Sequence, residues 1–84
     1  LSLIEIEETK KMKFINRKEE YLNLYHIYFE NETKEKKRDY VTNKESIEKI
    51  KIIIEFEIKS LNELFSICED IKSILNLIEV ILQI

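Results

Sequence analysis

The chain has a single cysteine, Cys68, and a single histidine, His26, two side chains that can act together as a nucleophile and its base. Such a pair works only where the thiol and the imidazole lie within hydrogen-bond reach of each other. Cys68 falls in a row of apolar residues that is spaced like one face of a helix. A cysteine buried in such a row packs as a small, inert hydrophobic side chain. We therefore expect Cys68 to belong to the core, and we predict no catalytic residue.

The sequence contains no complete pattern for a metal or a cofactor. His26 and Glu30 could supply two ligands to a metal ion, but no further ligand follows at a usual spacing. The absence of glycine excludes a glycine-rich phosphate-binding loop. The carboxylates are scattered among lysines, so no acid–base pair stands out. We predict a protein that is not an enzyme, with no metal site, no cofactor and no small-molecule substrate.

Residues 10–18 form a basic stretch that could contact nucleic acid. It contains five basic side chains and no acidic one: Lys10, Lys11, Lys13, Arg17 and Lys18. Lysines with aromatic neighbours such as Tyr21 and Tyr25 can hold phosphates and stack on bases. The same pattern is typical of an edge strand whose lysines prevent aggregation, and we favour this interpretation. The net charge of −3 also argues against a dedicated nucleic-acid binder.

The apolar C-terminal segment is the most informative part of the sequence. Apolar residues occupy nearly every side of a helix drawn through residues 74–84, and only Asn76, Glu79 and Gln83 interrupt them. Because the terminal helix of a small monomer normally keeps a solvated face, the segment indicates burial on two sides, against its own sheet and against a partner. The residues predicted to face the partner are Ile67, Ile74, Leu77, Ile81 and Ile84. The alternative is that the sheet alone covers the helix.

Two segments have the character of strands. In residues 50–58 every even position is apolar, and the odd positions are charged except for Ile53, which is the period of a strand with one buried face. Residues 21–29 are rich in aromatic and branched side chains on both faces, which predicts a central strand. A short strand over residues 1–8 and an edge strand within 10–18 complete the expected sheet. The polar residues 30–39 predict a solvated loop or hairpin tip.

A helix is expected after these strands. Ser60 and Glu63 have the spacing of a capping box, and the apolar period changes from that of a strand to that of a helix at the same point. The residues predicted to face the sheet are Leu64, Cys68, Ile71, Leu75, Ile78 and Leu82. A competing interpretation is one long coiled-coil helix from about residue 44 to residue 84, because apolar residues are spaced by three or four throughout. We favour a strand followed by a helix, since the Ile-rich residues 50–58 are poor helix formers.

The length of 84 residues allows one small domain over 1–84, and such a domain buries only around 60% of its unfolded surface. A single cysteine cannot form an internal disulfide, so further stability is expected from association with another protein. The lack of Gly, Pro and Ala beside abundant Ile, Lys, Asn and Glu indicates an A+T-rich genome. The sequence shows no long apolar run and no signal-peptide pattern, and a lone cysteine fits a reducing compartment. We therefore expect an intracellular protein, in the cytoplasm or an organelle interior.

These elements predict an α+β fold, in which a small antiparallel sheet of three or four strands packs against one long C-terminal helix. The predicted function is a non-enzymatic protein–protein interaction module, a small accessory subunit or inhibitor of a larger assembly. It is expected to bind a protein partner or a second copy of itself through the apolar C-terminal helix, and no membrane. The alternative is a peripheral subunit that contacts RNA or DNA through residues 10–18.

Overall fold

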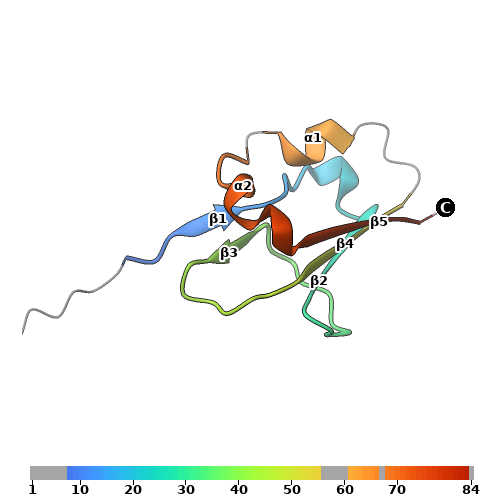
Figure 1. Ribbon diagram of the computed structural model, residues 1–84. Helices are drawn as coiled ribbons and strands as arrows, with labels where there is room; N and C mark the ends of the chain where they lie inside the picture. The colour runs from blue at the N-terminus through green and yellow to red at the C-terminus, as the bar shows by residue number, and fades with distance from the viewer. Residues whose placement is uncertain (1–7, 56–60, 67, 84) are drawn as a thin grey trace, which may run out of the picture.

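The computed structural model describes residues 8–55, 61–66 and 68–83, and Figure 1 shows their arrangement. Within these ranges the elements follow one another as β1 (Lys11–Lys13), the 3-10 turn η1 (Glu19–Tyr21), β2 (Tyr25–Phe29), β3 (Tyr40–Thr42), β4 (Ile50–Glu55), α1 (Leu61–Phe65), α2 (Ile71–Ile74), the 3-10 turn η2 (Leu75–Leu77) and β5 (Ile78–Gln83). Each helix is about one turn long. No helix in the described ranges is long and apolar enough to cross a lipid bilayer.

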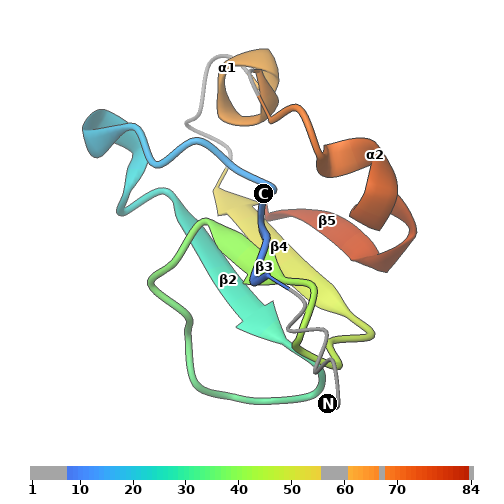
Figure 2. The ribbon, with the colours of Figure 1, turned by 90° about the vertical axis from the view of Figure 1, so that its left-hand side faces the viewer.

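The strands form two sheets. β1 and β3 make a short antiparallel ribbon, in which Met12 lies opposite Val41. The main sheet has the order β2-β4-β5; β2 runs antiparallel to β4, whereas β5 runs parallel to β4. Parallel neighbours require a crossover, and the chain that carries α1, α2 and η2 supplies it. Figures 1 and 2 show α1 and α2 on the same side of β4 and β5.

The prediction of a strand over residues 50–58 is confirmed for its first six residues, which form β4. Ile50, Ile52 and Ile54 are buried, while the residues between them are partly exposed. The rest of the predicted strand, residues 56–58, lies outside the described residues, as does Ser60 of the predicted capping box. The polar residues 30–39 form turns and an irregular loop, joined to β2 by a single bridge between Lys36 and Ile27, as expected.

A single hydrophobic core lies on one side of the main sheet. Its members come from β2, β3, β4, α1, α2 and the chain between β1 and η1: Phe14, Ile15, Tyr25, Ile27, Phe29, Val41, Ile50, Ile52, Ile54, Leu64 and Ile74. The rings of Phe14 and Phe29 meet edge to face, with 6.2 Å between their centroids. The other side of the sheet carries no such layer in the described part of the chain, and side chains such as His26 and Ile53 are partly exposed there.

The predicted long C-terminal helix is wrong. Residues 71–83 form α2, η2 and β5, so the chain folds into five strands in two sheets with only short helices among the described residues. The alternative coiled-coil helix from residue 44 is wrong as well, because β4 lies inside that range. Ile78, Val80 and Ile81 are β-branched and favour strands. Four of the six residues of β5 are apolar, and this composition suits a strand that pairs with β4.

The prediction of a central strand over residues 21–29 is confirmed as a strand for Tyr25–Phe29, but its extent and its central position are wrong. Only Tyr25–Phe29 is a strand, and it lies at one end of the main sheet, whereas β4 occupies the centre. The two faces of β2 differ: Tyr25, Ile27 and Phe29 are buried, but His26 and Tyr28 are partly exposed. Aromatic and branched side chains on both faces therefore did not require burial on both faces, since Tyr and His carry polar groups that can reach water.

Candidate functional site: the open edge of β5

Cys68 and His26 have different neighbours. The Cys68 side chain is buried, its Sγ lies 3.9 Å from Oδ1 of Asn16, and burial raises the pKa of its thiol. His26 lies on the other face of the main sheet, where its Nδ1 is 3.0 Å from Oε1 of Glu35 and its Nε2 is 3.5 Å from Oε1 of Glu55. The structure does not bring the thiol and the imidazole together as a nucleophile and its base.

His26 and Glu30 do not share a site either. The Glu30 carboxylate accepts hydrogen bonds from the backbone N–H groups of Glu48 and Lys49, so it holds the chain that leads into β4. Burial raises the pKa of Glu35, but hydrogen bonds from His26 and Lys37 outweigh this effect and lower it. Among the residues that the structure describes, no group of three or more His, Cys, Asp and Glu side chains could hold a metal ion.

The basic side chains of residues 10–18 mostly have partners within the chain. The lysine contacts are Lys10 with Asp70 at 3.2 Å, Lys11 over the ring of Tyr40 at 4.6 Å, Lys13 with Asp39 at 4.0 Å, and Lys18 with Glu20 and Glu63 at 2.8 Å each. Arg17 makes no hydrogen bond or ion pair with the described residues. Only Lys11–Lys13 is a strand, and it lies in the short ribbon with β3. The stretch is thus largely neutralised by the protein itself.

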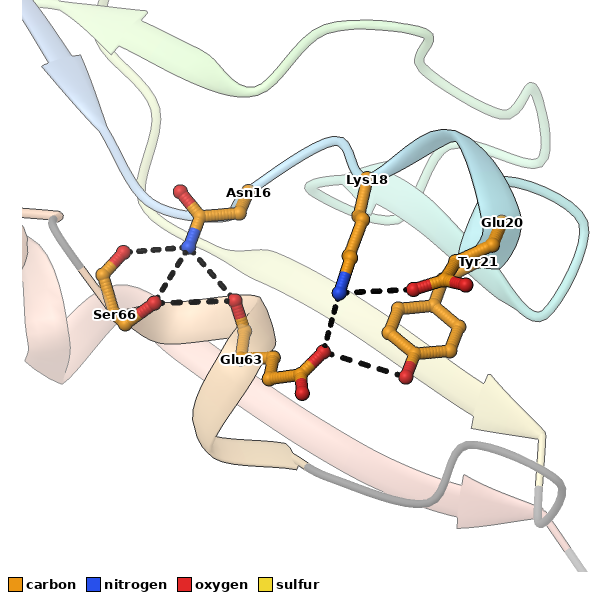
Figure 3. A network of polar contacts seen from close by, with 6 residues as sticks. All are labelled: Asn16, Lys18, Glu20, Tyr21, Glu63 and Ser66. Atoms are coloured by element: carbon orange, nitrogen blue, oxygen red, sulfur yellow. Dashed lines mark hydrogen bonds and ion pairs between the residues drawn. The ribbon is translucent and has the colours of Figure 1, made fainter.

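Lys18 is the centre of a surface network that Figure 3 shows. Its ammonium group binds the carboxylates of Glu20 and Glu63, and Glu63 also accepts a hydrogen bond of 3.4 Å from the hydroxyl of Tyr21. The hydrogen bonds that the ammonium donates to Glu20 and Glu63 hold the pKa of Lys18 above its usual range, and the ammonium in turn lowers the pKa of Glu63. The network joins η1 to α1, and an ammonium group already paired twice is a weak ligand for a phosphate.

A shallow hollow of about 410 Å³ lies beside this network, lined by Lys13, Asn16, Arg17, Lys18, Glu63 and Ser66. The Asn16 side chain is used within the protein, because its Nδ2 donates to the carbonyl oxygens of Glu63 and Ser66 (Figure 3). The lining carries charges of both signs, with no unpaired cluster of one sign that would select a ligand.

β5 has the most distinctive exposed surface of the described residues. In the parallel register Val80 lies beside Ile52, and Leu82 lies beside Ile54. Paired residues of neighbouring strands point to the same face of the sheet, so Val80 and Leu82 point to the side that holds the core. Nevertheless Val80 is 43% exposed and Leu82 is 57% exposed, whereas Ile52 and Ile54 are buried. The core-side face of the sheet therefore continues over β5 without a complete cover.

The edge of β5 is also the least protected strand edge in the described part of the chain. β4 pairs with one side of β5, and no described strand pairs with the other. The outer side of β2 is joined to the loop by a backbone hydrogen bond from the N–H of Lys36 to the carbonyl of Ile27. β1 is short and carries two lysines, whereas β5 has six residues and neither lysine nor arginine. Proteins usually protect such edges, so we define the exposed side of Ile78–Gln83 as the β5 edge and treat it as the candidate binding surface.

The predicted partner-facing residues fall in different places. Ile74 is 4% exposed and belongs to the core, and Leu77 packs against the core. Ile81 lies in β5, on the face away from the core, and is partly exposed. Ile67 and Ile84 are outside the residues whose placement is described. Because the predicted long helix is absent, these residues lie in different elements and do not form one surface.

Val80 and Leu82 were missed as exposed residues. The helical pattern assigned Leu82 to the sheet-facing stripe and gave Val80 no role, while alternation along residues 78–83 places both on one face.

Comparisons with protein-family models, curated proteins and solved structures find no match to this chain.

Proposed function

We propose that the chain is a non-enzymatic protein-interaction module, a small accessory subunit or inhibitor of a larger assembly, that binds through the β5 edge. The observation that supports this proposal is the exposure of Val80 and Leu82 on the core side of a strand whose outer edge is unpaired among the described strands. Unpaired backbone N–H and C=O groups at a sheet edge are a template for another strand. The two exposed side chains then supply apolar contacts to the partner.

The expected binding mode is addition of a partner strand to β5. Main-chain hydrogen bonds along the new strand pair would satisfy the outward-pointing backbone groups of β5. Contact with the partner would also remove the exposed parts of Val80 and Leu82 from water. Burial of about half of two such side chains contributes roughly 1.5–3 kcal/mol, which corresponds to about a 10- to 100-fold gain in affinity.

The test uses a double variant of the β5 edge, Val80→Thr with Leu82→Thr. Threonine is β-branched and favours strands, so β5 should persist while the apolar contact is lost. The matched control is Leu75→Thr, because Leu75 is 59% exposed but lies in η2 and not on the β5 edge. Each chain is immobilised and exposed to an extract of the native source, and the retained proteins are quantified by mass spectrometry.

We expect wild type and the Leu75→Thr control to retain the same proteins, and the double variant to lose them. Circular dichroism confirms that the three chains have the same fold. Retention of one set of proteins by all three chains would contradict binding through the β5 edge.

The alternative proposal, contact with RNA or DNA through residues 10–18, differs in its response to salt. Binding to phosphates weakens steeply as salt rises, whereas an apolar strand interface does not. The ion pairs of Lys10 and Lys18 within the chain make this alternative the weaker one.

We place the module in a reducing compartment, the cytoplasm or an organelle interior, because its single cysteine is unpaired.

A further inference from the structure

We infer that the strand added to the β5 edge is β5 of a second copy of the same chain, in antiparallel register with Ile81 on the two-fold axis. This inference rests on the proposed function and names the partner for the same surface. A two-fold axis perpendicular to the strands makes two identical strands antiparallel, because it reverses the direction of one strand relative to the other. An axis along the strands would place each N–H group opposite the same N–H group of the copy, so no hydrogen-bonded ladder could form. The register can then be deduced from the residues of β5.

Alternation of the backbone limits the choice of register. In β5 every second residue points its N–H and C=O groups toward β4, and the residues between them point outward. Opposite residues of an antiparallel pair must both belong to the outward set or both to the inward set. A two-fold axis between two residues would pair unlike sets, for example Val80 with Ile81 of the other copy. The axis must therefore pass through a single residue, and the central choices are Val80, Ile81 and Leu82.

An axis through Ile81 gives complementary pairs from Glu79 to Gln83. Val80 lies opposite Leu82 of the second copy on the face where both are exposed, and this contact occurs twice. On the other face Glu79 lies opposite Gln83 of the second copy, where an amide can donate to a carboxylate. The two Glu79 side chains, the charged groups of the two strands, are then at opposite ends of the interface. Nζ of Lys49 lies 3.1 Å from Oε2 of Glu79 and reduces its charge further.

The neighbouring registers are less favourable. An axis through Val80 would put each Glu79 carboxylate opposite Ile81 and bring the two carboxylates into diagonal contact, which is repulsive. An axis through Leu82 would pair only Ile81, Leu82 and Gln83 with described residues of the second copy, whereas an axis through Ile81 pairs all residues from Glu79 to Gln83. Charge and the extent of pairing together therefore select Ile81.

Three cysteine variants of the full chain read the register directly: Val80→Cys, Ile81→Cys and Leu82→Cys. A residue on the axis lies opposite its own copy, at the short Cβ–Cβ distance that a disulfide requires, whereas residues one position away lie opposite a different residue. Each variant is treated with oxidised glutathione, and covalent dimer is quantified on a non-reducing gel. Wild type is the control for Cys68, which is buried and whose thiol pKa is raised by that burial.

We expect several-fold more covalent dimer for Ile81→Cys than for the other two variants and for wild type. A maximum at residue 80 or 82 would overturn the Ile81 register.

A second measurement uses wild type alone: backbone amides of residues 79–83 should exchange with deuterium several-fold more slowly at high protein concentration than at low concentration. A monomeric mass by light scattering with no dependence of exchange on concentration would overturn pairing with a second copy. Loss of retained proteins in the Val80 and Leu82 double variant would still support the proposed function in that case.

Discussion

At the scale of single residues, a glutamate occupies a left-handed backbone position that glycine usually takes, and its carboxylate forms hydrogen bonds there. The sequence contains no glycine, and among the described residues the positive φ of 55° after β2 belongs to Glu30. A left-handed conformation costs a non-glycine residue about 1–2 kcal/mol. The Glu30 carboxylate offsets this cost, because it accepts hydrogen bonds from the N–H groups of Glu48 and Lys49 at 2.6 and 3.2 Å. The turn and the start of β4 are thereby held together.

Among the residues that the structure describes, Tyr25 has the buried polar side-chain atom that lacks a hydrogen-bond partner. Its side chain is buried in the core, and its hydroxyl has no hydrogen-bond partner among the described residues. Burial also raises the pKa of the phenol. A buried hydroxyl without a partner costs stability, since it loses its hydrogen bonds to water.

We predict that Tyr25→Phe leaves the free energy of unfolding unchanged or raises it by about 1 kcal/mol, because the ring stays in place while the unsatisfied hydroxyl is removed. The control is Tyr28→Phe, whose side chain is partly exposed on the opposite face of β2 and should change stability by no more than about 0.5 kcal/mol. Urea denaturation at equilibrium measures both. A loss of more than about 1 kcal/mol in Tyr25→Phe would show that the hydroxyl has a partner.

At the scale of elements, the crossover between the parallel strands depends on a bond to the N-terminal part of the chain. Nδ2 of Asn16 donates to the carbonyl oxygens of Glu63 and Ser66 (Figure 3). The backbone N–H of Asn16 also donates to the carbonyl of Leu64 at 2.6 Å. These carbonyls lie at the end of α1, where the helix itself supplies no N–H donors for them. A helix of one turn is not stable in isolation, so tertiary contacts of this kind hold it.

We predict that Asn16→Ala lowers the free energy of unfolding by about 1–2 kcal/mol, because the carbonyl oxygens at the end of α1 lose their donor. Asn23→Ala is the matched control, since Asn23 is exposed and makes no hydrogen bond with the described residues; its effect should stay within about 0.5 kcal/mol. Chemical denaturation measures both, and amide exchange of residues 61–66 should rise in Asn16→Ala alone. Equal stability of the two variants would exclude a clamping role for Asn16.

At the scale of the whole molecule, ion pairs hold several carboxylates in the folded state, and Glu45 beside β3 is one of them. Arg38 donates two hydrogen bonds to the Glu45 carboxylate, at 3.0 and 2.6 Å, and Glu45 also accepts from the N–H and the hydroxyl of Thr42. The hydrogen bonds from Arg38 lower the pKa of Glu45, and the bonds to Thr42 lower it further. The pKa values of Glu35 and Glu63 are lowered as well.

We predict that the protein loses stability in acid. A carboxyl group whose pKa is lower in the folded state binds fewer protons there than in the unfolded chain. Its contribution is present above the ordinary pKa of 4.5 and is lost as pH falls through the lower, folded pKa. Urea denaturation across this range should show a steady loss for wild type. Glu45→Gln should cost about 1–2 kcal/mol at neutral pH and converge toward wild type in acid.

The control for this prediction is Glu19→Gln, because Glu19 is exposed and its side chain has no ion pair within the described part of the chain. It should follow the wild-type profile. If Glu45→Gln showed the same slope with pH as wild type, Glu45 would not be a source of the acid sensitivity.

The sequence alone determined the strand at β4 and the polar loop over residues 30–39. In β4, Ile50, Ile52 and Ile54 alternate with other residues, which predicts that these three side chains share the face that packs against the core. The structure buries all three. Such local patterns survive folding because a one-residue slip would expose the whole apolar set. The packing role expected for Cys68 also agrees with its 5% exposure, although the long helix expected around it is absent.

Only the tertiary structure decided the fate of residues 71–83. Eight of these thirteen residues are apolar, and their spacing is compatible with a helical face and with a strand, so local preference does not separate the two. Pairing with β4 decides for the strand, since each backbone group of β5 that points toward β4 gains a hydrogen-bond partner. The same pairing fixes which side chains of β5 face the core side. The limited reach of the core layer then leaves Val80 and Leu82 exposed, and this property belongs to the packed molecule and to no local sequence pattern.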